Sequence, residues 1–131
     1  MPSTLIEVRR QYSQVEEQAL MDAVQLALRE AFQIPEWDRC VRLVSHEPHR
    51  FACSPRVEVP DRYTLVSIDC FAGRSLGSKR ALYEAIVTNF EHLGVPRGSV
   101  KILLRESARE NWGIRGGQAA CDVELGFNVN V

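Results

Sequence analysis

The strongest constraint on the fold is an internal repeat, because the second half of the chain follows the apolar pattern of the first. At an offset of 62 residues, apolar positions coincide: Ile6 with Ile68, Leu20 with Leu82, Val24 with Ile86 and Leu28 with Phe90. Beyond these positions the offset is 61, and the matches are Ile34-Pro35 with Val95-Pro96, Val41 with Ile102 and Leu43 with Leu104. Whatever one half folds into, the other half is expected to repeat.

Each half carries the pattern of a strand, a helix and a second strand. In the first half, residues alternate from Thr4 to Val8 as in a half-buried strand. Ser13 then precedes two glutamates and a run of apolar residues at helical spacing, which is typical of a helix N-terminus, and Pro35 is expected to end that helix. The segment CVRLVS (40–45) alternates again and predicts the second strand.

The second half repeats this order. TLVSIDCF (64–71) and SVKILLRE (99–106) predict strands, and LGSKRALYEAIVTNFEHL (76–93) predicts the helix between them. A strand-helix-strand crossover leaves its two strands parallel, so two such units can merge into one sheet with both helices on one face. We therefore expect an α+β fold in a single domain. Its units span about 2–45 and 63–106, followed by a C-terminal tail at 107–131.

The opposite face of the sheet must be covered as well, because two amphipathic helices cannot cover both sides. We expect that face to pack against other subunits, or against the proline-containing connection 46–62 or the tail. Association with other subunits is the more economical of these predictions.

Charge and composition narrow the possible partners. Sixteen Lys and Arg against seventeen Asp and Glu leave a net charge of −1, and the basic residues are scattered, so nucleic acid is not an expected partner. No apolar run approaches the roughly 20 residues that cross a bilayer, and the N-terminus lacks a secretory pattern, which favours the cytoplasm. The four cysteines contain no C-x-x-C pair and are expected to be reduced and mostly buried.

Two patterns suggest binding motifs but fit none. Cys40, His46, His49 and Cys53 are residue types that bind zinc, yet their spacing matches no common zinc site, and no metal is expected. The stretch GIRGGQ (113–118) lacks the Lys-Ser/Thr pair of a phosphate-binding loop, so it predicts a turn or hairpin.

The repeat, together with a proline directly after the initiator Met, resembles the tautomerase superfamily. Within it, the chain is most similar to the malonate semialdehyde decarboxylase branch, over essentially its whole length. The matching stretches are FQIPEWDRCVRLVSHEP, AGRSLGSKRALYEAI and ENWGIRGG. The resemblance implies a tautomerase-like fold, a homotrimer, an active site around an amino-terminal proline near a subunit boundary, and no cofactor.

Carried over by position, the resemblance implies roles for five residues. Pro2 matches the catalytic proline, Asp38 in IPEWDR the aspartate beside it, and Arg74 in AGRS the carboxylate-binding arginine. Trp112 and Ile114 match an apolar wall of the substrate pocket.

Three positions depart from the relatives. Ala72 stands where the defining decarboxylase has a second arginine, and Ile114 stands where the family has an aromatic residue. The first helix has Leu28 and Arg29 near the place where the cis-3-chloroacrylic acid dehalogenases have a histidine. Decarboxylation or tautomerisation is therefore expected before dehalogenation.

These residue types suit the implied chemistry. A free proline amine titrates near the usual α-amino value of about 7.7–8.0, so it can act as acid, base or nucleophile. The planar fork of Arg74 can bind a carboxylate through two hydrogen bonds, and the charge of Asp38 favours the ammonium form of Pro2. The expected activity is decarboxylation of a small 3-oxo acid, with keto-enol tautomerisation of 2-keto acids as the alternative.

Each of these residues also has a purely structural interpretation. Pro2 could be a stiff residue before a strand, Asp38 a turn cap, Arg74 a solvated residue before the second helix, and Trp112 a core or interface residue. If Met1 is retained, the nitrogen of Pro2 becomes an amide without basicity, and a non-catalytic trimeric binding protein is the alternative.

Overall fold

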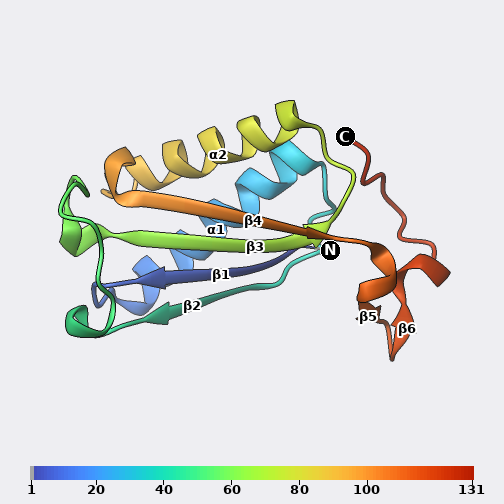
Figure 1. The fold of residues 1–131 in the computed structure, drawn as a ribbon, viewed down its shortest axis with the longest axis horizontal. Helices are drawn as coiled ribbons and strands as arrows, with labels where there is room; N and C mark the ends of the chain where they lie inside the picture. Colours follow the sequence, from blue (N-terminus) through green and yellow to red (C-terminus); the bar gives the residue numbers. More distant parts are fainter. Residues whose placement is uncertain (1) are drawn as a thin grey trace.

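Each half of the chain forms the β-α-β unit that the repeat predicts (Figure 1). The structure is a computed structural model that describes residues 2–131, so the question of whether Met1 is retained lies outside the described residues. The elements of the first unit are β1 (Ser3–Val8), α1 (Gln14–Phe32) and β2 (Val41–Ser45). The elements of the second unit are β3 (Thr64–Phe71), α2 (Leu76–Glu91) and β4 (Val100–Ser107).

The two units merge into one four-stranded sheet of order β2-β1-β3-β4. Within each unit the two strands are parallel, whereas the central strands β1 and β3 are antiparallel. Both helices lie on the same face of this sheet (Figure 1) and pack against each other. The predicted α+β fold, with two repeated units in one sheet, is confirmed.

The core lies between the sheet and the helices, at the positions that the repeat matches. Alternate residues of β1 are fully buried, as its alternating sequence predicts. All eight residues of the 62-residue offset are among the fully buried side chains: Ile6, Ile68, Leu20, Leu82, Val24, Ile86, Leu28 and Phe90. The repeat in the sequence is therefore a repeat of core positions.

Both helices begin as predicted but end earlier. The Ser13 hydroxyl accepts the backbone N–H of Glu16, and the Glu16 carboxylate accepts the backbone N–H of Ser13, which makes a capping box. Helix α1 stops before Pro35 as predicted, but its last residue is Phe32, because Gln33 adopts a left-handed conformation (φ 55°) that closes the helix two residues ahead of the proline. Helix α2 likewise ends two residues before the predicted boundary.

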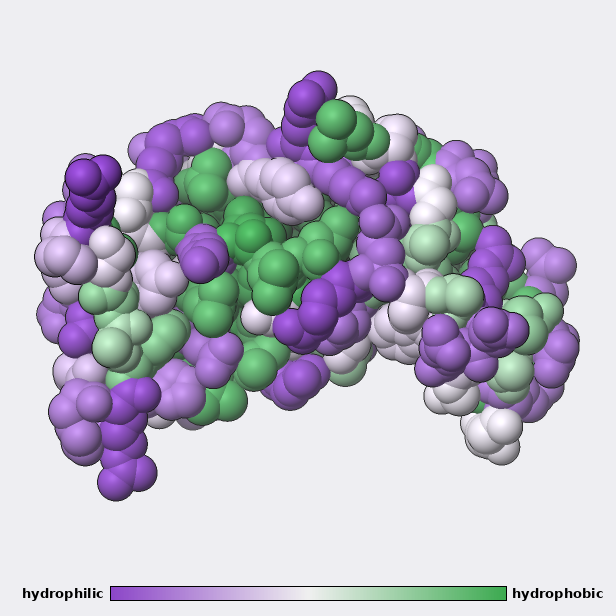
Figure 2. Space-filling view, in the orientation of Figure 1, coloured by the Kyte–Doolittle hydropathy of each residue, from purple (hydrophilic) through white to green (hydrophobic). Residues whose placement is uncertain are grey.

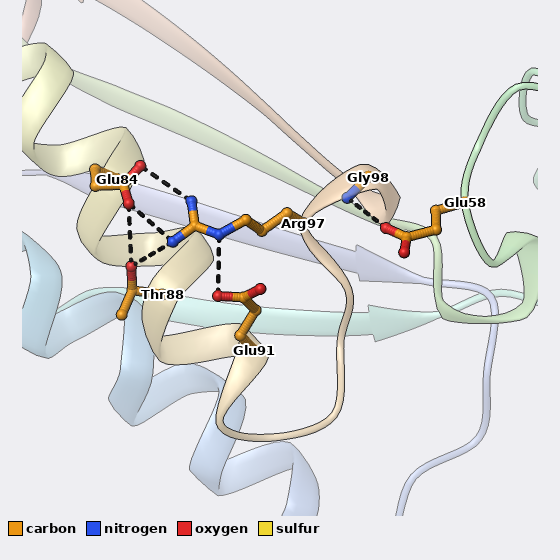
Figure 3. Close-up of polar contacts among 6 residues, drawn as sticks. All are labelled: Glu58, Glu84, Thr88, Glu91, Arg97 and Gly98. Carbon is orange, nitrogen blue, oxygen red and sulfur yellow. Dashed lines mark hydrogen bonds and ion pairs between the residues drawn. The ribbon is translucent and has the colours of Figure 1, made fainter.

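The turn before β4 holds the second helix and the connection between the units (Figure 3). The Arg97 guanidinium donates hydrogen bonds to three side chains of α2: Glu84, Thr88 and Glu91. On the other side of the turn, the Gly98 N–H donates to Glu58 Oε2 at 3.1 Å, which ties the connection 46–62 to the start of β4.

Residues 2–131 leave the sheet face opposite the helices uncovered. Its side chains include Val44, which is 42% exposed, and Leu103, which is 46% exposed. The connection 46–62 and the tail lie at opposite ends of the sheet (Figure 1). Between them, Figure 2 shows apolar surface gathered over the strands and bordered by hydrophilic side chains. In the described residues, neither segment covers the middle of this face, and its packing against other subunits stays a prediction.

Candidate active site

The segments that carry the predicted site residues meet at one end of the sheet. Because β1 and β2 run opposite to β3 and β4, the starts of the first pair and the ends of the second pair lie at the same edge. Pro2 precedes β1, Asp38 precedes β2, Arg74 follows β3 and Trp112 follows β4. The topology therefore brings residues from both units to one edge.

Pro2 is buried and leads directly into β1. The antiparallel pairing of β1 with β3 ends at Ser3, so Pro2 lies beside the end of β3. On the other side, the Thr4 N–H donates to the Cys40 carbonyl at 2.9 Å, which holds the segment containing Asp38 along the start of β1. Pro2 thus lies between the segments that carry the predicted acid and the predicted arginine.

Asp38 is positioned by its own backbone and is only 2% exposed. Its N–H donates to the Pro35 carbonyl at 3.1 Å, and its carbonyl accepts the Gln25 side-chain amide of α1 at 3.0 Å. Burial raises the pKa of the Asp38 carboxyl, and the guanidinium charges of Arg74 and Arg115 act in the opposite direction. A carboxyl group in this environment is suited to proton chemistry.

Arg74 is a buried cation with unused donors. It is 5% exposed, its guanidinium lies 4.8 Å from the centre of the Phe32 ring, and its Nη1 donates to the Phe71 carbonyl at 3.3 Å. Burial lowers the pKa of Arg74, while the charge of Asp38 opposes that shift. Its Nε and Nη2 atoms are buried and have no hydrogen-bond partner among residues 2–131. Buried donors of this kind are costly unless an acceptor reaches them, and a carboxylate is the acceptor that fits a guanidinium best.

An apolar wall borders this edge. The rings of Phe71 and Trp112 meet edge to face at 5.1 Å, and the Trp112 indole N–H donates to the Ser107 hydroxyl at 2.7 Å. Ile114 packs against the same cluster as Trp112. Phe71 links this wall to Arg74, because its ring packs on Trp112 while its carbonyl accepts the hydrogen bond from the Arg74 guanidinium. The two predicted wall residues are therefore brought together.

The C-terminal segment forms a small hairpin and then returns to the loop between β3 and α2, which carries Arg74. Strands β5 (Gly113–Ile114) and β6 (Gln118–Ala119) pair antiparallel, which confirms the hairpin predicted at GIRGGQ. Further on, the Val131 carbonyl oxygen accepts the hydroxyls of Ser75 at 3.0 Å and Ser78 at 2.7 Å. The tail thus packs beside the loop that carries Arg74.

Two residues at this edge were not singled out from the sequence. Phe32 supplies the ring under Arg74, and nothing distinguishes it in the sequence from other apolar residues of α1. Arg115 occupies the turn of the β5–β6 hairpin with a positive φ of 49°. In the sequence, the one signal for it is an arginine next to two glycines, and that pattern by itself indicates only a turn.

The other cavity lacks the reactive side chains of a catalytic site. A cavity of about 240 Å³ opens between the start of α1 and the end of α2, and it is lined by Tyr12, Val15, Glu16, Ala19, Leu20 and Leu93. Its walls are mostly apolar and lack the converging polar groups of a reactive site. Within residues 2–131, no three potential metal ligands lie together, and no helix is long and apolar enough to cross a bilayer.

The prediction of mostly buried thiols is wrong. All four cysteines are free, but Cys70 is the only buried one. Cys40, directly before β2, and Cys121, in the tail, are exposed because both lie in surface segments. Cys53 is half-buried in the connection 46–62.

Comparison with known proteins identifies relatives of the same fold. The family model described as tautomerase enzyme matches residues 38–115. A malonate semialdehyde decarboxylase inhibited by 3-bromopropiolate is 28% identical, with a TM-score of 0.76 over 89% of this chain and 92% of that chain. A second malonate semialdehyde decarboxylase, with decarboxylase and hydratase activities, is 20% identical, with a TM-score of 0.80 over 89% and 93% of the two chains.

A more distant relative has an equally similar backbone. Native fused 4-OT is 17% identical, with a TM-score of 0.82 over 92% of this chain and 98% of that chain. At such identity the similarity shows the fold alone. The family model, however, covers more than half of the sequence and runs from Asp38 through Arg74 to the β5–β6 hairpin. The chain therefore belongs to the tautomerase enzyme family.

Proposed function

We propose that the chain decarboxylates a small 3-oxo acid, as malonate semialdehyde decarboxylase does, with Pro2 acting through a free amine after removal of Met1. The observation that carries this proposal is Arg74, whose buried Nε and Nη2 atoms have no partner within residues 2–131. A substrate carboxylate would accept both N–H groups. The 28% identical decarboxylase, inhibited by the small carboxylate 3-bromopropiolate, supports the same substrate class.

The proposed residues divide the reaction between them. Arg74 holds the substrate carboxylate, and the protonated amine of Pro2 donates a hydrogen bond to the 3-oxo oxygen. When the bond to the carboxylate carbon breaks, its electron pair moves into the carbonyl group and CO₂ leaves. The enolate that remains is stabilised by the hydrogen bond from Pro2, and its carbon then takes one proton from Pro2 or a water molecule. Asp38 orients Pro2 or a water molecule, and the wall of Trp112 and Ile114 lowers the local dielectric, which strengthens these contacts.

The same groups allow a keto-enol tautomerase, in which neutral Pro2 moves a proton between carbon and oxygen of a 2-keto acid. Fused 4-OT proteins, which share the fold, form trimers, and the uncovered apolar sheet face of this chain favours the same assembly. We therefore propose that the active unit is a homotrimer. A chain that keeps Met1 would instead be a non-catalytic binding protein.

A substitution of Pro2 tests the proposal. Intact-mass measurement should first show that Met1 is absent from the purified protein. A panel of 3-oxo and 2-keto acids is then assayed for CO₂ release and for enol-keto conversion, which separates the two activities. We expect Pro2→Ala to lower turnover by about 100-fold or more, because the reacting amine is changed.

The control is Pro55→Ala, which changes an exposed proline of the connection 46–62 and should leave turnover unchanged. Unchanged turnover in Pro2→Ala, or full activity in a protein that retains Met1, would show that the chemistry does not use this amine.

A further inference from the structure

The turn of the β5–β6 hairpin contains an arginine in a conformation that favours glycine. Arg115, Gly116 and Gly117 follow one another with φ values of 49°, 83° and 92°. The two glycines adopt such angles freely, whereas the Cβ of an arginine makes them unfavourable. The Gln118 side chain donates to the Arg115 carbonyl at 3.0 Å and helps to hold the turn. A glycine would suit this backbone better, which directs attention to what the arginine side chain contributes.

Among residues 2–131, that side chain donates to neutral backbone groups and forms no ion pair with a carboxylate. Its Nη1 donates to the Glu124 carbonyl at 2.7 Å, and its Nη2 lies 3.5 Å from the Leu125 carbonyl. Both acceptors are neutral backbone groups. The ion pairs formed within residues 2–131 do not include Arg115. Arg115 is exposed, and since a guanidinium has five N–H donors, three are open to solvent or to another acceptor.

The position of this guanidinium connects it with the candidate active site. Leu125, whose carbonyl it approaches, is buried in one cluster with Phe71, and Ile114 precedes it in β5. Phe71 in turn receives the hydrogen bond from Arg74. The charge of Arg115 also reaches Asp38, whose pKa it lowers against the effect of burial. Two cations from different elements therefore act on the same edge of the sheet.

We propose that Arg115 is a second anion-binding residue of this site, so that the site prefers small acids with two oxygen functions, a carboxylate on Arg74 and a second carboxylate or carbonyl oxygen on Arg115. This inference rests on the proposed function, since it assumes that Arg74 binds a carboxylate. It adds a selectivity that one cation could not provide, because a simple monocarboxylate leaves the Arg115 donors unused.

Binding of malonate and propionate tests the proposal. Both acids have three carbons, but only malonate carries a second carboxylate. Their affinities are measured by NMR titration of the Trp112 indole N–H, which donates to Ser107 at this edge. We expect the wild-type protein to bind malonate at least ten times more tightly than propionate.

The informative variant is Arg115→Gly, because glycine keeps the left-handed turn without strain. It should lose the preference for malonate while propionate affinity changes by less than about twofold. Arg115→Asn, which also tolerates the turn, is the second variant should the first fail to fold. Arg56→Gly removes an exposed arginine from the connection at the other end of the sheet and should change neither affinity.

Two results would contradict the role of Arg115, and only the second of them would also contradict the proposed function. If Arg74→Gln abolishes propionate binding but Arg115→Gly keeps the malonate preference, Arg115 only caps the tail carbonyls and the proposed function stands. If the wild-type protein binds neither acid, or Arg74→Gln leaves both affinities unchanged, the carboxylate site and the proposed function are both wrong.

Discussion

Among single residues, Asp38 is one whose burial in the candidate active site is expected to lower the stability of the fold at neutral pH. Its carboxyl is buried at the edge of the sheet, and burial raises its pKa above the value of about 3.9 that an unfolded chain has. The folded state therefore binds this proton more tightly than the unfolded state does. The protonated carboxyl costs the fold nothing below about pH 3.9. As the pH rises through the folded-state pKa, the buried carboxyl ionises and the free energy of unfolding falls.

We therefore expect Asp38→Asn to be more stable than the wild-type protein at pH 7, because asparagine stays neutral. The difference in the free energy of unfolding should shrink as the pH falls towards about 4, where the wild-type carboxyl is protonated as well. Urea unfolding of both proteins at pH 4, 5.5 and 7 measures this difference, and turnover is expected to fall in the variant. An Asn variant that is less stable at pH 7 would mean that the contacts of the ionised carboxylate outweigh the cost of burying it.

At the level of elements, the turn between α2 and β4 depends on a glycine at one position. A Cβ on Gly98 would lie 2.8 Å from both Cβ and Oε2 of Glu58, the residue that anchors the connection 46–62 (Figure 3). The same substitution at Gly77, in the first turn of α2, meets nothing closer than the Ser75 hydroxyl at 3.8 Å.

We expect Gly98→Ala to lower the free energy of unfolding by about 1–3 kcal/mol, because Glu58 and the connection must move. Gly77→Ala is the matched control and should raise it by up to about 1 kcal/mol, since alanine favours the helix. Thermal or urea unfolding of the two variants gives both values. If the two alanines behaved alike, the contact between Gly98 and Glu58 would not hold the connection in solution.

For the whole molecule, the uncovered sheet face should decide the assembly. Leu103 on this face and Leu26 on α1 are almost equally exposed, at 46% and 45%. Leu103→Lys is expected to convert the proposed trimer into monomers, because a charge would be buried against another subunit. Leu26→Lys should leave the assembly intact. Light scattering or sedimentation measures the mass of each, and the opposite pattern would assign the interface to the helices.

Much of the fold was predictable from local patterns. The alternation around Ile6 and Ile68 specifies strands, and the helical spacing of Leu20, Val24 and Leu28 specifies a buried helix face, because a side chain's direction follows from its own element. The Ser13 capping box is equally local. Pro35 indicates that α1 must stop before it, but the exact last residue was not predictable, since the left-handed Gln33 carries no comparable signal.

The site is where local patterns were insufficient. Residue types and the resemblance pointed to Pro2, Asp38 and Arg74, but the burial of Asp38 and the unused donors of Arg74 depend on neighbours from other elements. The antiparallel pairing of β1 with β3 brings the two units' ends to one edge, and the hairpin then adds Arg115. The pattern of residues along the chain thus specifies each helix and strand. The site residues come together only through pairing between strands that are distant in the sequence, and only the folded sheet establishes that pairing.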